Sequence, residues 1–235
     1  MRPAEIAIAV DWAAGEGWNP GLGDAACFNT IDPEGFLIGE LEGAPAATIS
    51  CLNYDSAFAF LGFYLVRRDL RGRGYGANIR YGGTSAGMSR PPAGVVPLAK
   101  VPFATIEVDD ARVFPAPRSA FLRAWISAPG HIGRALVRDG SLAAWGVIRP
   151  CRRGHKIGPL IADDRVAAEV VLAALVAAAG AREVFLDVPS VNAEAVALAQ
   201  GHDFAPVFET ARMYTGAIRP LALERVFGVT TFELG

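Results

Sequence analysis

One short stretch of the chain combines the residue types that bind phosphate groups. It consists of Arg71, Gly72, Arg73, Gly74, Tyr75 and Gly76. Glycine at every second position lets backbone N–H groups approach a ligand closely and adopt positive φ. A run of such N–H groups with a helix N-terminus behind it favours a pyrophosphate, and flanking arginines add positive charge. Because an apolar run at residues 57–66 closely precedes the stretch, the sequence predicts an anion-binding turn after a buried strand.

Two other interpretations compete with this one. A dinucleotide-binding unit would place G-x-G-x-x-G near the start of a βαβ unit, with an acidic residue about 20 positions later. Here the spacing is G-x-G-x-G, the preceding strands form an antiparallel pattern, and no downstream strand ends in a suitable acid. A glycine-rich surface turn with two solvated arginines is the plainer alternative. The hairpin and strand before the turn favour the anion site over both.

The composition describes a chain that can bury a full core. It has 235 residues, of which 52% are hydrophobic, and this length suits one large domain or two small ones. The net charge of −2 gives no reason to expect a nucleic acid or an anionic membrane as partner. No uninterrupted apolar run approaches the roughly 20 residues of a transmembrane helix. We therefore expect a cytoplasmic protein that binds neither nucleic acid nor membrane.

Cysteine and histidine have no spacing that indicates a metal or redox site. The three cysteines, Cys27, Cys51 and Cys151, are odd in number and widely separated, which favours buried reduced thiols. The three histidines are scattered along the chain, so no metal site is predicted.

The first third of the chain is predicted to hold two helices and then a three-stranded meander. Glu42-Gly43 and Asp55-Ser56 are turn dipeptides that separate the strands. We expect helices at residues 4–14 and 24–29, the second capped by Asp24, and strands at residues 35–41, 45–54 and 57–66.

The second half has a mixed α/β pattern, with antiparallel strands first and a βαβ crossover later. Asp139-Gly140 predicts a hairpin turn, and Asp163 or Asp164 would cap a long alanine-rich helix that ends at Gly180. The expected strands are residues 103–109, 130–138, 141–148, 157–162, 183–188, 207–215 and 227–234, and the expected helices are residues 117–125, 166–179 and 192–200. Because the first third opens in a similar order, the pattern predicts two copies of one fold.

Residues 61–76 (LGFYLVRRDLRGRGYG) resemble motif A of the GNAT acetyltransferase superfamily, which is R/Q-x-x-G-x-G/A after the fourth strand. Arg71, Gly74 and Gly76 match this motif. The resemblance implies a mixed α/β GNAT-like fold, with acetyl-CoA as co-substrate and no metal. It also implies that the turn amides hold the pyrophosphate and that the strand before the turn hydrogen-bonds the pantetheine arm like an extra strand. The residues that it assigns to acetyl-CoA are Tyr64, Leu65, Val66, Arg71, Gly72, Arg73, Gly74, Tyr75 and Gly76.

The second half resembles the C-terminal acetyltransferase-like domain of tandem GNAT proteins, over residues 112–125, 146–162 and 227–235. Its helix after Ser190 partly matches the family pattern N-x-x-A-x-x-L-Y-x-x-x-G-F. Asn192, Ala195, Leu198 and Phe204 fit this pattern.

This second copy also departs from the family. Ala199 stands where the family often has a tyrosine that protonates the departing CoA thiolate, and Asp203 stands in place of a glycine. Asp163-Asp164 suits a helix N-terminus but would repel a pyrophosphate. The resemblance therefore implies a degenerate copy that serves substrate binding or assembly.

The first copy is expected to be incomplete. A complete domain of the family continues after motif A through helix, strand, helix and strand, on the order of 40 residues. Here Ala77 to Tyr81 has the pattern of a final strand, directly before a Gly-, Ser- and Pro-rich linker. Either the protein is internally shortened or residues are absent from the sequence. The predicted division is an incomplete first domain at residues 1–81, a linker at 82–98 and a fuller second domain at 99–235.

Other polar residues carry weaker signals. Glu40 and Glu107 lie on or near predicted strands, where a general base could deprotonate an amine, but solvated strand carboxylates are more common. No catalytic residue is therefore assigned. The basic cluster of Arg152, Arg153, His155 and Lys156 could meet an acidic substrate or a CoA phosphate, but a solvated loop is favoured.

Three hypotheses fit this pattern. The first is an N-acetyltransferase that moves an acetyl group from acetyl-CoA to a small-molecule or peptide amine by direct attack. Strand amides near Leu65 would polarise the thioester carbonyl. The second is a non-catalytic acyl-CoA-binding or ligand-sensing protein. The third is that a second chain completes the shortened first domain through its exposed sheet edge, which would make a homodimer.

Overall fold

The computed structural model describes residues 1–66, 81–84, 94–207 and 219–233. The helices are α1 (Pro3–Gly15), α2 (Asp24–Phe28), α3 (Phe103–Asp110), α4 (Ser119–Ser127), α5 (Arg165–Ala179) and α6 (Ala193–Gly201), with short 3₁₀ turns at Leu98–Lys100 and Leu223–Arg225. The strands are β1 (Phe36–Leu41), β2 (Ala44–Asp55), β3 (Phe58–Val66), β4 (Tyr81–Thr84), β5 (Val95–Pro97), β6 (Ile132–Arg138), β7 (Ser141–Pro150), β8 (His155–Ala162), β9 (Glu183–Leu186), β10 (Ala205–Pro206) and β11 (Val226–Gly228).

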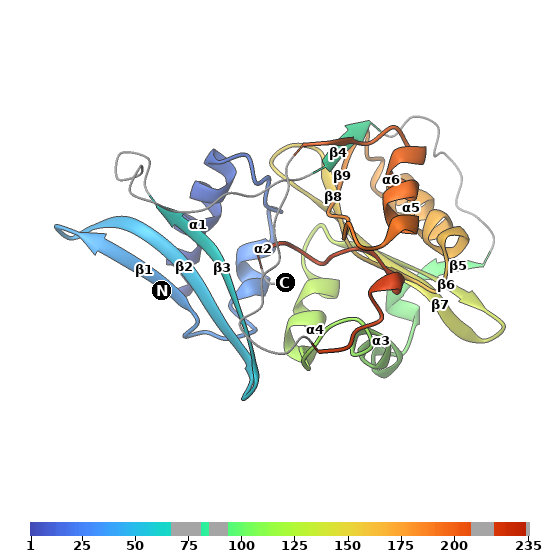
Figure 1. Cartoon of the computed structure of the whole chain (residues 1–235), viewed down its shortest axis with the longest axis horizontal. Helices are drawn as coiled ribbons and strands as arrows, with labels where there is room; N and C mark the ends of the chain where they lie inside the picture. Colours follow the sequence, from blue (N-terminus) through green and yellow to red (C-terminus); the bar gives the residue numbers. More distant parts are fainter. Residues whose placement is uncertain (67–80, 85–93, 208–218, 234–235) are drawn as a thin grey trace.

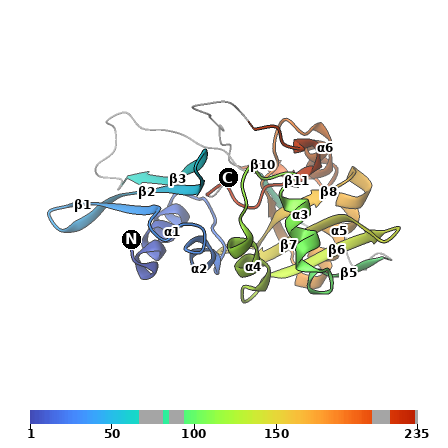
Figure 2. The same cartoon turned by 90° about the horizontal axis from the view of Figure 1, so that it is seen from below.

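The strands form two sheets that lie side by side (Figure 1). The first is an antiparallel meander in the order β1-β2-β3, with α1 and α2 on one face (Figure 2). The second follows the order β10-β4-β9-β8-β7-β6-β5, with β11 paired to β8. Among the described strands only β8 and β9 pair in parallel, so this mixed sheet confirms the predicted mixed α/β fold class.

Most predicted elements are present. The hairpin of β6 and β7 turns at Asp139-Gly140, where both residues have positive φ (53° and 77°), as a two-residue type I′ turn requires. Helix α5 begins after Asp164, whose side chain accepts the N–H of Ala167, and it ends at left-handed Gly180. No helix of the described residues is long and apolar enough to cross a membrane.

The strand predicted at residues 103–109 is wrong, because this segment is helix α3. Its β-branched residues suggested a strand. The segment instead buries Ile106, Asp109 and Asp110, which share one face only in a helix. Those carboxylates pair with Arg225 and Arg118 from distant segments, so tertiary contacts override local preference here.

Two other predictions need smaller corrections. The residue that caps α2 is Gly23, and Asp24 is instead a buried residue of the first turn. The last predicted strand is shorter than expected, because β11 covers only Val226–Gly228. The strand predicted at residues 207–215 lies outside the described residues except for Val207, which follows the short strand β10 (Ala205–Pro206).

The domain boundary predicted at residue 81 falls at the start of β4. This strand was expected to finish the first copy, but it pairs with β9 and β10 in the second sheet. Residues 82–84 of the predicted linker are therefore part of a sheet. Within the described residues, the first copy has no counterpart of α5, β9, α6 and β10.

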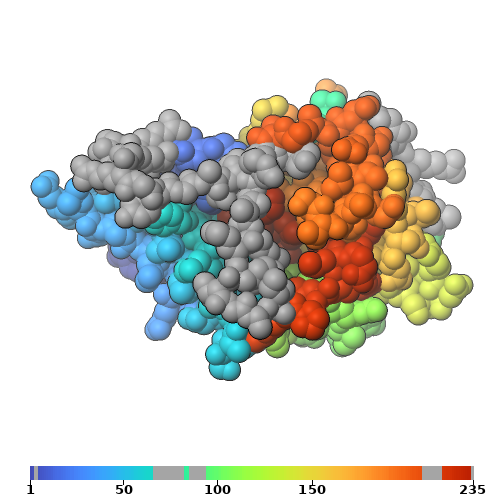
Figure 3. Space-filling model, in the orientation of Figure 1, coloured from blue at the N-terminus to red at the C-terminus, as the bar shows by residue number. Residues whose placement is uncertain are grey.

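One hydrophobic core runs through both halves. Phe28, Phe36 and Phe63 of the first half belong to the same cluster of buried residues as Trp125 and Trp145 of the second. The rings of Phe28 and Trp125 stack at a centroid distance of 6.4 Å. The space-filling view shows the first half, in blue to cyan, on the left and the second half, in green to red, on the right (Figure 3).

Candidate functional site

A β-bulge interrupts β3 just before the residues predicted to contact acetyl-CoA. Ser50 of β2 faces Gly62 and Thr48 faces Leu65, so three residues of β2 oppose four of β3. Phe63 lies inside the bulge with φ of 47°. Positive φ is rare for a bulky residue, and such strain persists only where the surroundings hold it.

The surroundings hold Phe63 at both its backbone and its ring. The Thr48 hydroxyl donates a hydrogen bond of 3.0 Å to the Phe63 carbonyl. The ring is 1% exposed and packs edge-on against Phe28 at 5.5 Å, with Phe36 and Trp18 within 6.3 Å. Because bulges often occur beside active sites and re-aim backbone groups, β3 has the geometry expected of a ligand-binding strand.

The predicted site residues divide into two groups. Tyr64 and Leu65 follow the bulge directly, Tyr64 being 43% exposed and Leu65 buried, and Val66 ends the strand. Residues 71–76 of the predicted pyrophosphate turn lie outside the described residues.

The second half repeats the bulge in β8. Ile148 of β7 faces Ile157, and Gly146 faces Leu160, so three residues of β7 again oppose four of β8. The carbonyl at the bulge, here that of Gly158, again accepts a side-chain hydrogen bond, from Trp125 Nε1 at 2.9 Å. The matched meanders β1-β2-β3 and β6-β7-β8 are thus two copies of one structural unit.

The two bulges differ in one donor. Register places Pro159 of β8 where β3 has Tyr64. Proline has no backbone N–H, so the second bulge cannot present the amide that the first can. The two copies are therefore not chemically equivalent.

The N-terminus of α5 is occupied by carboxylates of the chain itself. Asp164 accepts the N–H of Ala167 at 2.7 Å and pairs with Arg138 at 2.8 Å, while Asp163 pairs with Arg225 at 2.7 Å. Negative charge at this helix end satisfies its free N–H groups and disfavours a further anion.

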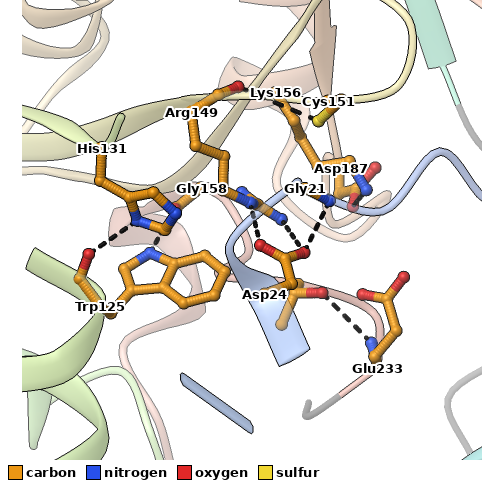
Figure 4. A network of polar contacts seen from close by, with 11 residues as sticks. Gly21, Asp24, Trp125, His131, Arg149, Cys151, Lys156, Gly158, Asp187 and Glu233 are labelled. Carbon is orange, nitrogen blue, oxygen red and sulfur yellow. Dashed lines mark hydrogen bonds and ion pairs between the residues drawn. The ribbon is translucent and has the colours of Figure 1, made fainter. Parts of the chain in front are cut away.

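A buried ion pair joins the two halves (Figure 4). Asp24 of α2 and Arg149 of β7 are both 0% exposed, and Arg149 Nε lies 2.8 Å from Asp24 Oδ1. The Arg149 guanidinium also lies 4.4 Å from the centroid of the Trp125 ring. Burial alone would raise the pKa of Asp24, but the charge and hydrogen bonds of Arg149, the charge of Lys156 and the Gly21 amide together outweigh burial and hold the pKa below its usual value.

Further titratable groups surround this pair. Lys156 Nζ lies 3.5 Å from Asp187 Oδ2, with both side chains fully buried, and Glu233 from the C-terminal segment approaches the same cluster (Figure 4). Burial and the charge of Arg149 lower the pKa of His131 to about 4. Burial, reinforced by Asp24, raises the pKa of Cys27 to about 11, so this thiol is not a nucleophile at neutral pH.

Sequence reasoning missed the Asp24–Arg149 pair, since its partners lie 125 residues apart and share no motif. The weaker predicted candidates do not gather at the β3 bulge. Glu40 is exposed near the end of β1, and Glu107 lies on helix α3. The basic cluster is largely occupied by ion pairs, because Arg152 contacts Asp11 and Arg153 contacts Glu183.

Comparisons with known proteins agree with this architecture. The model of the acetyltransferase (GNAT) domain matches residues 106–228, and that of the acetyltransferase (GNAT) family matches residues 6–79. A holothin acyltransferase of Pseudoalteromonas sp. is 28% identical, covering all of this chain and 94% of its own length. That match extends over 276 positions against 235 residues here, so at least 41 positions of the relative have no counterpart in this chain.

Two solved structures share the fold over most of their length. A putative acetyltransferase from Pyrococcus horikoshii has a TM-score of 0.69 at 19% identity, covering 100% of this chain and 94% of its own. A tandem GNAT protein from the clavulanic acid biosynthesis pathway has a TM-score of 0.58 at 12% identity, covering 88% and 94%. With both halves matched by family models and two matched bulges, this chain belongs to the GNAT acetyltransferase family as a tandem protein.

Proposed function

We propose that the protein is an N-acyltransferase whose first copy binds acyl-CoA, with acetyl-CoA as the donor to be tested first. The observation that carries this proposal is the strained bulge at Phe63, directly before Tyr64 to Val66. The pyrophosphate would lie on the turn of residues 71–76, and the pantetheine arm would run along the end of β3.

The residues of β3 would act by positioning and by polarising. Acyl-CoA supplies an activated thioester when bound. Backbone N–H groups after the bulge, near Leu65, would donate to the thioester oxygen, where negative charge develops as an amine attacks. Because Thr48 and the aromatic cluster fix the bulge before any ligand arrives, these donors need no reorganisation.

For the acceptor we propose a small-molecule amine. The relative whose match covers the whole of this chain is named holothin acyltransferase. At 28% identity this name supports the class of acceptor and not the compound.

A thiol-release assay tests the proposal. Purified protein is incubated with acetyl-CoA and either a panel of small-molecule amines or a panel of peptides, and free CoA thiol is measured. We expect amine-dependent release with at least one small molecule, and its loss in the variant Arg71→Ala. The variant Arg67→Ala, altered just before the motif, is the matched control. Release that is equal with and without amines, or the same in Arg71→Ala, would refute the proposal.

A second candidate function is acyl-CoA binding without catalysis. Two observations favour binding without catalysis. The relative has positions that this chain lacks, and the described part of the first copy has no counterpart of α5, β9, α6 and β10. Binding of acetyl-CoA with no transfer to any amine in the same assay would support this candidate.

A homodimer remains a proposal. Among the described residues, no strand pairs with the second edge of β3, which a second chain could therefore extend. Light scattering distinguishes a monomer from a dimer. A monomer at working concentration would exclude the extension of β3 by a second chain.

A further inference from the structure

The second copy has a place that corresponds to the proposed acyl-CoA cleft of the first, and the chain fills it. We infer that the C-terminal segment, residues 226–231, permanently occupies the gap between β8 and β9, so that only the first copy accepts acyl-CoA. The inference goes beyond the proposed function and depends on it only for the identity of the ligand.

The backbone pairing shows how the gap is filled. β8 and β9 pair in parallel only as far as Ile157 and Leu186, although β8 continues to Ala162. Beyond that point β11 takes the edge of β8, with Val226 opposite Ile161 and Gly228 opposite Leu160. Val229 N then donates to the Asp187 carbonyl at 2.9 Å, just beyond the end of β9. One segment thus hydrogen-bonds both walls, as a strand added to a sheet does.

Side chains anchor the start of this segment. Arg225 pairs with Asp109 at 2.6 Å and with Asp163 at 2.7 Å. The Asn192 side-chain amide lies within hydrogen-bonding distance, 2.8 to 3.3 Å, of the Val226 carbonyl of the segment and of the Leu223 and Glu224 carbonyls just before it. Because Asn192 also caps α6 through Ala195 N, it ties the segment to the element beside β9.

The segment is also packed too closely to leave room for a ligand. Phe227 is 1% exposed and Thr231 0% exposed. A Cβ added to Gly158 would lie 2.4 Å from the Thr230 carbonyl oxygen and 2.5 Å from that of Val229. Only glycine permits this approach, so the segment lies directly against the bulge of β8.

Two independent features agree with a closed second copy. Pro159 removes the N–H donor at the bulge, and the Asp164 carboxylate already accepts the N–H of Ala167 at the start of α5, where a pyrophosphate would otherwise bind. The occupant is also covalently attached, and tethering through a short linker gives an effective concentration of about millimolar.

Hydrogen–deuterium exchange of the intact chain tests the inference, with acetyl-CoA as the probe. We expect the amides of residues 226–231 to exchange as slowly as those of β8, both without ligand and at saturating acetyl-CoA. Ligand-dependent protection should be confined to the first copy, around β3. Faster exchange at residues 226–231 on adding acetyl-CoA, or new protection at the start of α5, would overturn the inference.

Native mass spectrometry provides a second measurement that needs no variant. One acetyl-CoA per chain is expected, and two per chain would contradict a closed second copy. If no acetyl-CoA binds and the segment stays protected, the proposed function fails while the closed cleft stands. The two claims can therefore fail separately.

Discussion

Asp24 and Arg149 are both fully buried, although each comes from a different half of the chain. Each compensates the charge of the other, and the Gly21 amide adds a hydrogen bond to Asp24 at 2.9 Å. Removing one partner of such a pair leaves a buried charge without compensation, which is far more costly than replacing both by apolar groups. This contact should therefore tolerate paired substitutions better than single ones.

The variant Asp24→Asn should lower the free energy of unfolding by about 3–5 kcal/mol, because Arg149 would stay buried without a counter-charge. Urea unfolding measures the loss. The double variant Asp24→Leu with Arg149→Met is the control and should recover most of the stability. A single variant within about 0.5 kcal/mol of the unchanged protein would contradict the role given to this pair.

His131 makes stability depend on pH. Its Nδ1 donates to the Trp125 carbonyl at 2.7 Å, and burial beside Arg149 lowers its pKa to about 4 from the ordinary value of 6.5. Between pH 4 and pH 6.5 the His131 side chain is protonated in the unfolded chain but neutral in the folded chain. Stability from His131 is thus complete above pH 6.5 and is lost as the pH falls to 4.

We expect the free energy of unfolding to fall by at most about 3 kcal/mol between pH 6.5 and pH 4 through this group. Unfolding curves across that range measure it. His131→Gln should flatten the pH dependence, whereas the control His155→Gln should keep it. An equal slope in His131→Gln would show that other groups cause the effect.

At the scale of elements, turns and caps were predictable because they depend on a few adjacent residues. Asp139-Gly140, Asp164 and Gly180 act locally, and the structure confirms each. The α3 helix was not predictable in this way, since its buried Asp109 pairs with Arg225, 116 residues away. The bulge of β3 also escaped prediction, because no local residue of that apolar run signals a positive φ.

The bulge yields a prediction for Thr48. Thr48→Val keeps the shape of this side chain but removes its hydrogen bond to the Phe63 carbonyl, which holds the strained backbone. We expect a stability loss of about 1–3 kcal/mol and a lower kcat for acyl transfer. The matched control is Thr30→Val, which loses a bond to Cys27 away from the bulge. If kcat falls equally in both variants, the bulge has no special part in transfer.

In the whole molecule, segments from one half of the chain pack against or pair with the sheet of the other half. β4 lies at the start of the predicted linker but pairs with β9 and β10 in the second sheet, and the Glu233 carbonyl lies against Gly62 of β3. The repeat itself could be predicted from the order of helices and strands. This exchange could not be, because it depends on contacts between segments far apart in the chain.

Because one core and one buried ion pair serve both halves, we expect a single cooperative unfolding transition. Calorimetry checks this, since the calorimetric and van't Hoff enthalpies should agree. Two resolved transitions would mean that the halves fold independently, contrary to the shared core.

We propose that the first copy holds acyl-CoA on the turn of residues 71–76. Isothermal titration of acetyl-CoA into the intact chain tests it most directly, alongside the double variants Arg71→Ala with Arg73→Ala and, as control, Arg67→Ala with Arg68→Ala. We predict one acetyl-CoA per chain, lost in the motif variant and kept in the control. No binding to the intact chain, or binding that survives loss of Arg71 and Arg73, would contradict the claim.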